Sequence, residues 1–360
     1  MLLGVHTQVL QHPVSNFREE DGTGTFWNRV EDDCHRSRVR LHRWAVHQQR
    51  LSQLCATGRT YNSITMTTLP GTAFRLALQA ESPLQLVGTT NPYHAVMAKA
   101  AGFRALYLSG SGVATASYGL PDLGITTLDN VLEDVRRITS AVDLPLLVDV
   151  DTGWGGAFMI ARTVAEMTRA GAAGVHIEDQ VQAKRCGHRP GKQVVSTAEM
   201  CDRLKAASDA KTYGDFVLMA RTDAIAVEGV DAAIDRSVAY VEAGAEMIFA
   251  EAVADLGDYQ RFSDATGVPV LANLTEFGQT PAFTVDELRT AGVAIALYPL
   301  TAFRAANRAA ENVFRTLRSA GTQKSMIDDL QTRDELYEYL DYHSYERKLD
   351  ELFEAGPSEN

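Results

Sequence analysis

Two acidic side chains stand where a short apolar run of the sequence ends, and they could bind a metal ion. Asp149 and Asp151 end the run that begins at Pro145. Because residues two apart point to the same side of a strand, we expect both carboxylates on one face. Like charges this close repel unless a cation neutralises them. Oxygen ligands without a His or Cys cluster favour Mg²⁺, with Mn²⁺ as the alternative, over zinc.

Polar residues also follow five other short apolar runs. They are Ser109–Gly112, His176–Asp179, Arg221–Asp223, Glu251 and Asn273–Glu276. An arginine guanidinium binds a carboxylate through two parallel hydrogen bonds. Arg221, together with Arg304 and Arg333 further along the chain, therefore predicts a substrate with several carboxylates.

A long polar segment, Gln180–Lys192, follows one of these strand ends and has the character of a lid. It is basic, it is punctuated by Gly and Pro, and it is longer than an ordinary strand-to-helix connection. It carries one cysteine, Cys186. The neighbours of that cysteine include Lys184, Arg185 and His188, and positive neighbours favour the reactive thiolate. We therefore predict that this cysteine is catalytic.

A repeated pattern of short apolar run, polar turn and amphipathic stretch positions these residues. The runs are mostly rich in Val, Ile and Leu and lack clear alternation, which is typical of strands buried on both faces. Eight such units predict an α/β fold of the (β/α)8 TIM-barrel type, with its active site at the carboxyl ends of the strands. An open doubly wound sheet is the alternative, but its usual glycine-rich first turn is absent. The predicted strands are Leu84–Gly88, Ala105–Ser109, Pro145–Val150, Gly174–Ile177, Phe216–Ala220, Met247–Ala250, Val268–Ala272 and Val293–Leu297.

Amphipathic helices are predicted between the strands and at the end of the chain. Apolar residues from Leu128 to Ile138 recur at the helical spacing, with Thr126 as the predicted N-cap and Asp129 three residues on. A C-terminal helical arm carries further amphipathic faces, and packing on the barrel of its own chain is the alternative to exchange with a neighbour.

Composition places the chain among globular proteins and excludes several classes. Its 360 residues are 45% hydrophobic and 22% charged, with no apolar run long enough to span a membrane. The net charge of −12 argues against general nucleic-acid binding. Four Cys are too few for a disulfide framework, so a reducing, cytoplasmic setting fits best. We expect a small-molecule substrate and neither a nucleic-acid nor a membrane partner.

The first 65 residues differ from the rest of the chain. They contain no Lys, and their eight Arg and six acidic residues give a net charge of +2, so the remainder carries −14. We interpret residues 1–65 as an extension outside the fold, either disordered or upstream of a true start at Met66. A mitochondrial presequence is the rival interpretation, which the acidic residues disfavour. The predicted domains are this extension, a catalytic barrel at 66–320 and the helical arm at 321–360. Deleting the extension is expected to leave activity intact.

Short motifs at the predicted strand ends and in the lid together resemble one enzyme superfamily. They are Tyr107–Gly110, Gly119–Asp122, Val148–Asp151, Lys184–Pro190, Met219–Asp223, Asn273–Glu276 and Gln331–Arg333. The lid motif, Lys-Arg-Cys-Gly-His-Arg-Pro, is similar to the active-site loop of the isocitrate lyase and phosphoenolpyruvate mutase superfamily. Its arginine-containing form resembles the 2-methylisocitrate lyase branch. The resemblance extends over residues 70–355.

This resemblance implies cleavage of 2-methylisocitrate to pyruvate and succinate, a step of propionate breakdown by the methylcitrate route. It also implies Mg²⁺, a cytoplasmic homotetramer and C-terminal helices exchanged between subunits. Asp149 and Asp151 match the metal ligands, and Cys186 matches the acid that protonates the succinate-side carbanion. Tyr107 is our candidate for the base that takes the hydroxyl proton. The other matching catalytic and supporting residues are Asp122, Glu178, Lys184 and His188, and the substrate contacts besides Cys186 are Ser109, Gly110, Ser111, Gly187, Arg221, Glu251, Asn273, Thr275, Arg304 and Arg333.

The chain departs from this pattern in two places, and three other functions stay open. Ser111 stands where the second Gly is usual, and Ala250 precedes Glu251 where Pro is common in close relatives. An isocitrate lyase is usually longer and has a different residue pair after Cys-Gly-His. A phosphonate mutase or hydrolase of the same fold lacks the lid cysteine. A binding protein without catalysis would not need a reactive thiol beside a metal site.

Overall fold

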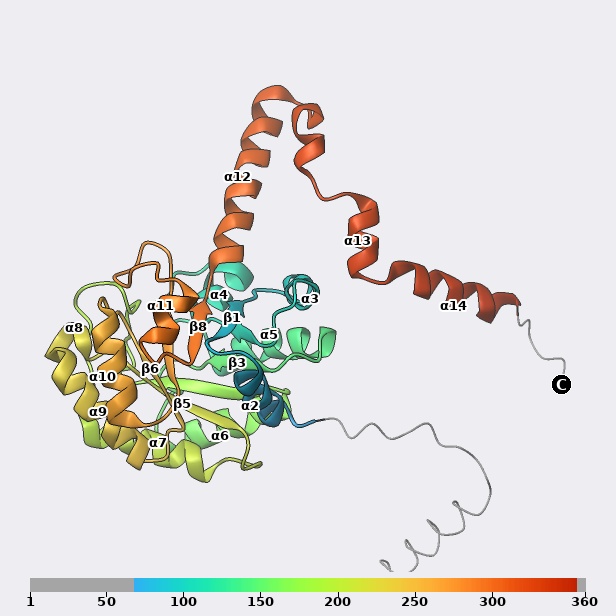
Figure 1. The fold of residues 1–360 in the computed structure, drawn as a ribbon. Coiled ribbons are helices and arrows are strands. Elements are labelled where there is room, and N and C mark those ends of the chain that lie inside the picture. Colours follow the sequence, from blue (N-terminus) through green and yellow to red (C-terminus); the bar gives the residue numbers. More distant parts are fainter. Residues whose placement is uncertain (1–67, 355–360) are drawn as a thin grey trace, which may run out of the picture. The chain divides into compact units, whose positions relative to one another are not determined.

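The computed structural model describes residues 68–354, and these contain a closed barrel of eight parallel strands. Figure 1 shows the strands at the centre with helices around them. The predicted (β/α)8 fold is therefore confirmed. The strands are β1 (Leu84–Gly88), β2 (Leu106–Leu108), β3 (Leu146–Asp149), β4 (Gly174–Glu178), β5 (Val217–Thr222), β6 (Met247–Ala250), β7 (Val270–Asn273) and β8 (Ile295–Tyr298).

Each strand pairs with the next one in the sequence, and the first strand closes the ring with the last. Leu84 of β1 lies beside Ile295 of β8 in parallel register. Each predicted apolar run overlaps one strand, and the bounds shift by at most two residues. This consecutive order brings the carboxyl ends of all eight strands to one rim of the barrel.

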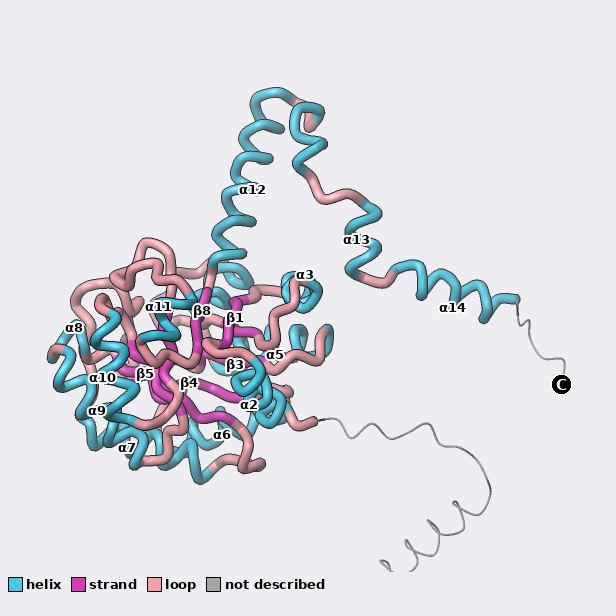
Figure 2. The backbone as a smooth tube through the Cα atoms, in the orientation of Figure 1, coloured by secondary structure: helices cyan, strands magenta, loops and turns pink. Residues whose placement is uncertain are grey.

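Helices alternate with the strands and cover the outside of the barrel (Figure 2). Besides these, Val113–Ser117 form a π-helical turn and Lys324–Asp329 a 3₁₀ helix. The helices are α2 (Pro70–Ala80), α3 (Pro92–Ala100), α4 (Gly110–Gly112), α5 (Leu128–Ala141), α6 (Ala157–Arg169), α7 (Thr197–Asp209), α8 (Ile225–Glu228), α9 (Val230–Glu242), α10 (Leu256–Thr266), α11 (Val285–Thr290), α12 (Thr301–Ala320), α13 (Arg333–Tyr339) and α14 (Tyr342–Glu354).

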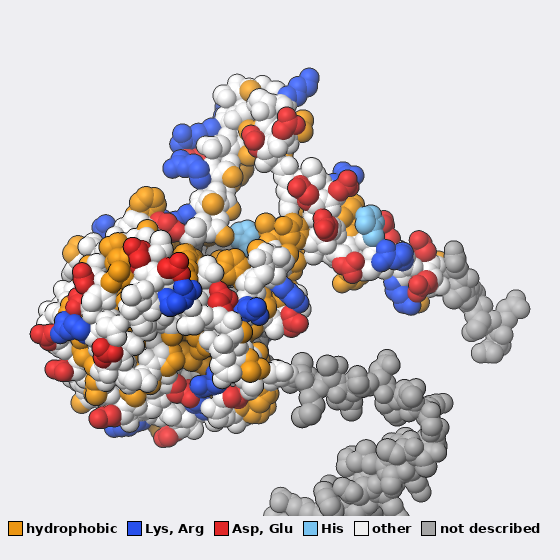
Figure 3. Space-filling model, in the orientation of Figure 1, with side chains coloured by type: hydrophobic (Ala, Val, Ile, Leu, Met, Phe, Trp, Pro, Cys, Tyr) orange, Lys and Arg blue, Asp and Glu red, His pale blue; other side chains and the backbone are white. Residues whose placement is uncertain are grey.

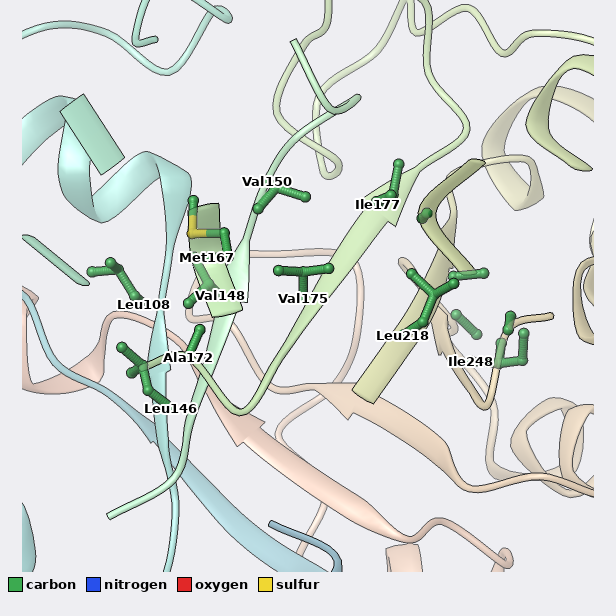
Figure 4. Close-up of a cluster of buried hydrophobic side chains, with 14 of the residues drawn as sticks. Leu108, Leu146, Val148, Val150, Met167, Ala172, Val175, Ile177, Leu218 and Ile248 are labelled. Atoms are coloured by element: carbon green, nitrogen blue, oxygen red, sulfur yellow. The ribbon is translucent and has the colours of Figure 1, made fainter. Parts of the chain in front are cut away.

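Two apolar clusters explain why the strands lack alternation in the sequence. The outward side chains of the strands, such as Val148 and Val175, pack with helical residues such as Met167 of α6 (Figure 4). The inward side chains, such as Met219 and Phe249, form a second cluster that fills the barrel. Because both faces are buried, both must be apolar. Burial of each large side chain contributes about 1.5–3 kcal/mol to folding.

The N-cap prediction for α5 was wrong by one residue. Thr127, not Thr126, caps the helix, and it forms a capping box with Asn130 rather than with Asp129. Thr126 is buried, and its carbonyl oxygen accepts a hydrogen bond from Trp154 Nε1. Thr is a favoured N-cap residue, so both Thr126 and Thr127 suit this position by local preference. Only the contact of Thr126 with Trp154 distinguishes the two.

The C-terminal arm consists of helices whose apolar side chains are largely exposed. Gly321, at φ 69°, ends α12 in the left-handed conformation that glycine adopts readily, at the residue where the predicted arm begins. In α12 and α13 no residue is buried. Figure 3 shows hydrophobic side chains among charged ones over these helices. Tyr93 of α3 contacts the arm twice: its hydroxyl donates to Gln331 Oε1 at 2.9 Å, and its ring lies edge-on to Tyr339 of α13 at 6.1 Å between ring centres.

Two further predictions concern the N-terminal extension and the absence of a membrane-spanning segment. The extension proposed at residues 1–65 lies outside the described residues. Among residues 68–354, no helix is both long and apolar enough to cross a membrane.

Candidate active site

The inward faces of the strands change from apolar to polar toward their carboxyl ends. In β5, Val217 and Met219 belong to the barrel core, and the next inward residue is Arg221. In β6, Phe249 belongs to that core, and Glu251 follows two residues later. A strand period of two therefore carries each polar side chain to the rim of the barrel while its apolar predecessors hold the core.

A cavity of about 90 Å³ opens at this rim under the lid. Most of the predicted site residues line it. Gly110, Asp151 and Glu178 do not line it, although Gly110 lies against the carboxylates of Asp149 and Asp151. Arg333, an exposed residue at the start of α13, does not line it either. The lining residues are Tyr107, Ser109, Ser111, Asp122, Asp149, Lys184, Arg185, Cys186, Gly187, His188, Arg221, Glu251, Asn273, Thr275, Pro299, Leu300 and Arg304.

Asp149 and Asp151 converge, although not in the way that the strand period suggests. β3 ends at Asp149, and Asp151 adopts a positive φ of 48° beyond it, so the expectation of one shared strand face was wrong. Asp149 accepts hydrogen bonds at 3.0 Å from the backbone N–H groups of Gly110 and Asp151. A Cβ at Gly110 would lie 3.1 Å from one oxygen of each carboxylate. The glycine therefore leaves the space that both acids face.

The two carboxyl groups differ in their affinity for a proton. Burial alone would raise the pKa of Asp149, but charge attraction from His176 and Lys184 outweighs it and lowers that pKa to about 2. Burial raises the pKa of Asp151 to about 6, against the attraction of Lys184. Asp149 is therefore the permanently charged member of the pair.

Lys184 enters the site from the lid and contacts two acids. Its Nζ forms ion pairs with Asp151 and, at 2.9 Å, with Asp122. Burial opposes its charge, but the attraction of Asp151 and Glu178 raises the pKa of Lys184 well above the ordinary value. The lysine thus brings a permanent positive charge to a rim that is rich in carboxylates.

Buried acids exceed buried bases at this rim, which fits a divalent cation. Burial raises the pKa of Glu178 well above its ordinary value, and its Oε1 is buried without a hydrogen-bond partner. Among residues 68–354, no three His, Cys, Asp or Glu side chains are grouped to enclose a metal by themselves. Asp149 and Asp151 therefore fit an ion that takes its other ligands from water and substrate, as Mg²⁺ commonly does.

Arg221 is held in a fixed orientation by neighbouring acids and an aromatic ring. Its Nε donates to Asp223 Oδ2 at 2.9 Å, and its Nη2 lies 3.6 Å from Glu251 Oε1. Its guanidinium carbon lies 5.0 Å from the centre of the Phe249 ring. Burial opposes its charge, but Asp223 and Glu251 raise the pKa of Arg221 well above the ordinary value. A pre-oriented guanidinium of this kind suits a substrate carboxylate.

Tyr107 pairs with His176, a residue without a predicted role. Its hydroxyl lies 2.9 Å from His176 Nε2. Burial, with the negative charge of Asp149, raises the pKa of Tyr107 well above 10, so the phenol keeps its proton. Burial also lowers the pKa of His176 to about 4. His176 stands two residues before Glu178 on the inward face of β4, and the period of two is the signal that could have identified it.

The lid carries Cys186 over the cavity with its side chain exposed. Its basic neighbours do not surround the sulfur as the sequence suggested. Lys184 contacts acids of the rim, and Arg185 donates to the Pro190 carbonyl at 3.3 Å. His188 Nε2 lies 2.8 Å from Glu251 Oε1. The lid cations therefore anchor the loop that presents the thiol.

His188 ties the lid to two other segments of the rim. Its Nδ1 accepts a hydrogen bond of 2.9 Å from the backbone N–H of Gln279, in the loop after β7. In a neutral ring the proton therefore resides on Nε2, which faces Glu251. Burial would raise the pKa of Glu251, but Arg221 and His188 lower it. Asn273 Nδ2 lies 3.2 Å from the same carboxylate.

The family of the chain follows from its sequence. Residues 74–318 match the family described as phosphoenolpyruvate phosphomutase. The chain belongs to this family. Its own fold is the closed eight-stranded barrel with the site at the carboxyl rim.

Within it, the similar curated proteins are 2-methylisocitrate lyases. The one from Escherichia coli (strain K12) is 66% identical over 285 residues, covering 79% of this chain and 96% of that protein. The one from Vibrio cholerae serotype O1 (strain ATCC 39315 / El Tor Inaba N16961) is 62% identical over 294 residues, covering 80% and 96%.

Solved structures of the superfamily share the fold. A 2,3-dimethylmalate lyase aligns with a TM-score of 0.72 and 33% identity, covering 81% of this chain and 97% of that chain. A phosphonopyruvate hydrolase in complex with oxalate and Mg²⁺ aligns with a TM-score of 0.69 and 30% identity, covering 78% and 98%.

Proposed function

We propose that this chain is a carbon–carbon lyase that cleaves 2-methylisocitrate to pyruvate and succinate with Mg²⁺ as its cofactor. One observation carries the proposal. Cys186, Asp149 and Arg221 line one cavity at the barrel rim, in a chain 66% identical to a 2-methylisocitrate lyase. A lid thiol, a carboxylate for a metal and a guanidinium for a substrate carboxylate are the groups that this cleavage needs.

In the proposed reaction the bond between the carbinol carbon and its neighbour breaks. The hydroxyl group loses its proton to a basic group of the site and becomes the keto group of pyruvate, and the electron pair of the broken bond passes to the succinate-side carbon. That carbon then takes a proton. The site must therefore stabilise negative charge on an oxygen and donate a proton on the opposite side of the broken bond.

Asp149 and Asp151 would hold Mg²⁺, and Mn²⁺ is an alternative ion with the same preference for oxygen ligands. When bound, Mg²⁺ supplies positive charge to the oxygen that becomes the pyruvate keto group. The segment Ser109, Gly110 and Ser111 would bind the pyruvate end of the substrate. The location of Ser109 and Ser111 in the cavity lining, with Asp149, supports this role.

Arg221 would bind a carboxylate of the succinate portion, and Asn273, Thr275 and Arg304 would add further contacts. All four residues line the cavity. Arg304 is the most exposed of them, with its Nε 3.4 Å from Glu276 Oε2. Arg333 stays a prediction for the same role, and it would act on a neighbouring subunit because it does not line the cavity of its own chain.

Cys186 would donate the proton to the succinate-side carbon, because it is the thiol that the lid presents to the cavity. Tyr107 is less suited to be the base than the sequence suggested, because its raised pKa keeps the phenol protonated. We propose instead that Tyr107 donates a hydrogen bond to the developing oxyanion, with His176 fixing the direction of its hydroxyl. Closure of the lid would exclude water while the carbanion exists.

The proposed setting is the cytoplasm, and the proposed assembly is a homotetramer with exchanged C-terminal helices. The exposed apolar side chains of the arm support an assembly, because isolated chains rarely leave so many in contact with water. Phe314 is 69% exposed and Phe353 is 76% exposed.

A substrate comparison tests the proposed activity against its alternatives. The full chain is offered 2-methylisocitrate, isocitrate and phosphonopyruvate, each with Mg²⁺ and with EDTA. Pyruvate, glyoxylate and phosphate are followed. Pyruvate from 2-methylisocitrate alone, lost in EDTA, is the expected result. Faster glyoxylate formation from isocitrate, or turnover of phosphonopyruvate without cleavage of 2-methylisocitrate, would favour the other members of the superfamily.

A further inference from the structure

Lys192 is a buried lysine at the end of the lid, and the proposed chemistry gives it no role. Its side chain is 1% exposed. Its Nζ donates to the backbone carbonyl of Gly187 and, at 2.8 Å, to Asp223 Oδ1. Gly187 directly follows Cys186 in the sequence. One ammonium group therefore joins the peptide beside the thiol to a carboxylate of the barrel.

The same carboxylate also orients the arginine proposed to bind the substrate. Asp223 Oδ2 accepts from Arg221 Nε at 2.9 Å, and Asp223 Oδ1 accepts from Arg221 Nη2 at 3.3 Å. Asp223 Oδ1 thus receives hydrogen bonds from both Lys192 and Arg221. The position of the lid beside Cys186 is thereby linked, through three consecutive hydrogen bonds, to the position of the guanidinium.

Other contacts hold the lid at its base, at the rim and at Lys184, which pairs with Asp122 and Asp151. At the base, Gln180 and Val194 form an antiparallel bridge. At the rim, His188 reaches Glu251 and Gln279. Gly187 lies so close to Arg221 that a Cβ on it would collide with the guanidinium. A small displacement of the Gly187 peptide toward Arg221 would therefore disturb the position of the guanidinium directly.

We propose that Lys192 is a positioning residue that fastens the closed lid to the Arg221–Asp223 pair. It does not line the cavity, so it acts through Gly187 and Asp223 and not on the substrate. In the closed lid it fixes Cys186 relative to the group that holds the substrate. The catalytic part of this inference rests on the proposed lyase activity, and the structural part does not.

The test compares Lys192→Met with a matched variant, Lys211→Met. Lys211 also makes a partly buried ion pair, at 2.9 Å with Glu246, but on the amino-terminal side of β6. In both variants the acid keeps an arginine partner, Arg221 for Asp223 and Arg75 for Glu246. Amide hydrogen exchange is measured in the full chain for the lid peptides and for the barrel strands. Steady-state kinetics with 2-methylisocitrate and Mg²⁺ and the thermal midpoint are measured on the same samples.

Lys192→Met is expected to speed exchange in residues 182–193 at least tenfold, while exchange in the barrel strands stays as in the parent. It is expected to lower kcat by about 100-fold, the loss typical of a small misplacement of a reacting group, with a smaller change in KM. Lys192→Arg, which keeps the charge, is expected to regain part of kcat. Lys211→Met is expected to change neither lid exchange nor kcat.

Three results would overturn the proposal. One is unchanged lid exchange in folded Lys192→Met. Another is exchange that rises equally in the lid and in the barrel strands, since Lys192 would then stabilise the whole fold and not the lid. If Lys192→Met yields no folded protein, Lys192→Arg decides, and parent-like lid exchange and kcat in that variant would refute the need for this geometry. If no variant, nor the parent, cleaves 2-methylisocitrate while the lid alone loosens, the lyase proposal fails and the lid contact stands.

Discussion

Cys186 reaches the active site on a loop, whereas the other proposed catalytic groups stand on barrel strands or are held tightly against them. Its sulfur has no ion pair or hydrogen bond of its own among the contacts of residues 68–354, and its basic neighbours bind other groups. The position of this thiol in the active site therefore depends on the conformation of the lid. This makes the thiol the residue whose replacement should separate catalysis from binding.

Cys186→Ser is predicted to lower kcat by at least about 100-fold, because general acid catalysis typically contributes 10²–10⁴-fold and a serine hydroxyl is a much weaker acid. Mg²⁺-dependent binding of 2-methylisocitrate should survive, since the variant keeps the volume and the lid contacts. Kinetics and calorimetric titration give the two quantities. The control is Cys201→Ser, in α7, whose Sγ faces the Ala239 carbonyl at 3.5 Å. Near-parent cleavage by Cys186→Ser would remove the acid assignment.

Gly110→Ala is predicted to weaken Mg²⁺ binding by about 10-fold to 100-fold, the effect usual for disturbing the surroundings of metal ligands. The added Cβ would lie 3.1 Å from oxygens of Asp149 and Asp151. The measurement is the Mg²⁺ concentration that gives half-maximal activity. Gly214→Ala is the control, because nothing lies within 4 Å of a Cβ there. Equal Mg²⁺ requirements in the two variants would contradict a metal held at this pair.

At this scale the sequence predicts which side chains meet, but not how each is used. Asp149 and Asp151 converge as expected, yet a positive φ at Asp151 replaces the predicted strand geometry. His176 and Lys192 had no predicted role, because the charge and burial of a lone His or Lys follow from distant neighbours. Tyr107 was expected to act as a base, and its burial beside Asp149 argues against that role.

Among the elements, the lid has the most direct influence on chemistry, and Gln180 fixes its first turn. The Gln180 side chain donates to the Arg185 carbonyl at 2.9 Å and accepts from the Arg185 N–H at 3.0 Å. These two hydrogen bonds fold the start of the lid back on its base. The loop therefore approaches the rim along a defined path.

Gln180→Ala is predicted to favour the open lid by about 2 kcal/mol, taking about 1 kcal/mol for each hydrogen bond, which is roughly 30-fold in the closing equilibrium. Exposed Gln182, two residues later, provides the control variant Gln182→Ala. Trypsin cleavage after exposed Arg185 reports the open population. Cleavage at the parent rate in Gln180→Ala would show that other contacts alone close the lid.

The sequence predicts the elements well and their ends less well. Eight short apolar runs in regular succession predict eight buried strands, and all eight are found. The start of α5 differs by one residue, because adjacent Thr126 and Thr127 are equal candidates until Trp154 contacts one of them. Local rules cannot distinguish positions that only a tertiary contact separates.

At the scale of the whole molecule, the arm presents apolar surface that residues 68–354 leave exposed. Tyr345 is 73% exposed and Leu352 is 63% exposed. The sequence predicts these amphipathic faces, and their exposure is consistent with a partner subunit that covers them. Assembly through these faces is therefore a proposal that removal of the arm can test.

A chain that ends at Gly321 is predicted to lose the proposed tetramer, because removing the arm removes the apolar faces that would join subunits. Light scattering after size-exclusion chromatography measures the mass. The control is full-length Arg333→Ala, which should keep the parent mass while its KM rises if Arg333 acts on a neighbouring site. A tetramer formed by the truncated chain would contradict the role of the arm.

The central claim is that this barrel splits 2-methylisocitrate, and the products test it most directly. The full chain is incubated with 2-methylisocitrate and Mg²⁺, and pyruvate and succinate are quantified by proton NMR. We predict equal amounts of both products, loss of both in EDTA, and recovery when Mg²⁺ is restored. No pyruvate under these conditions, or pyruvate without an equal amount of succinate, would contradict the proposed function.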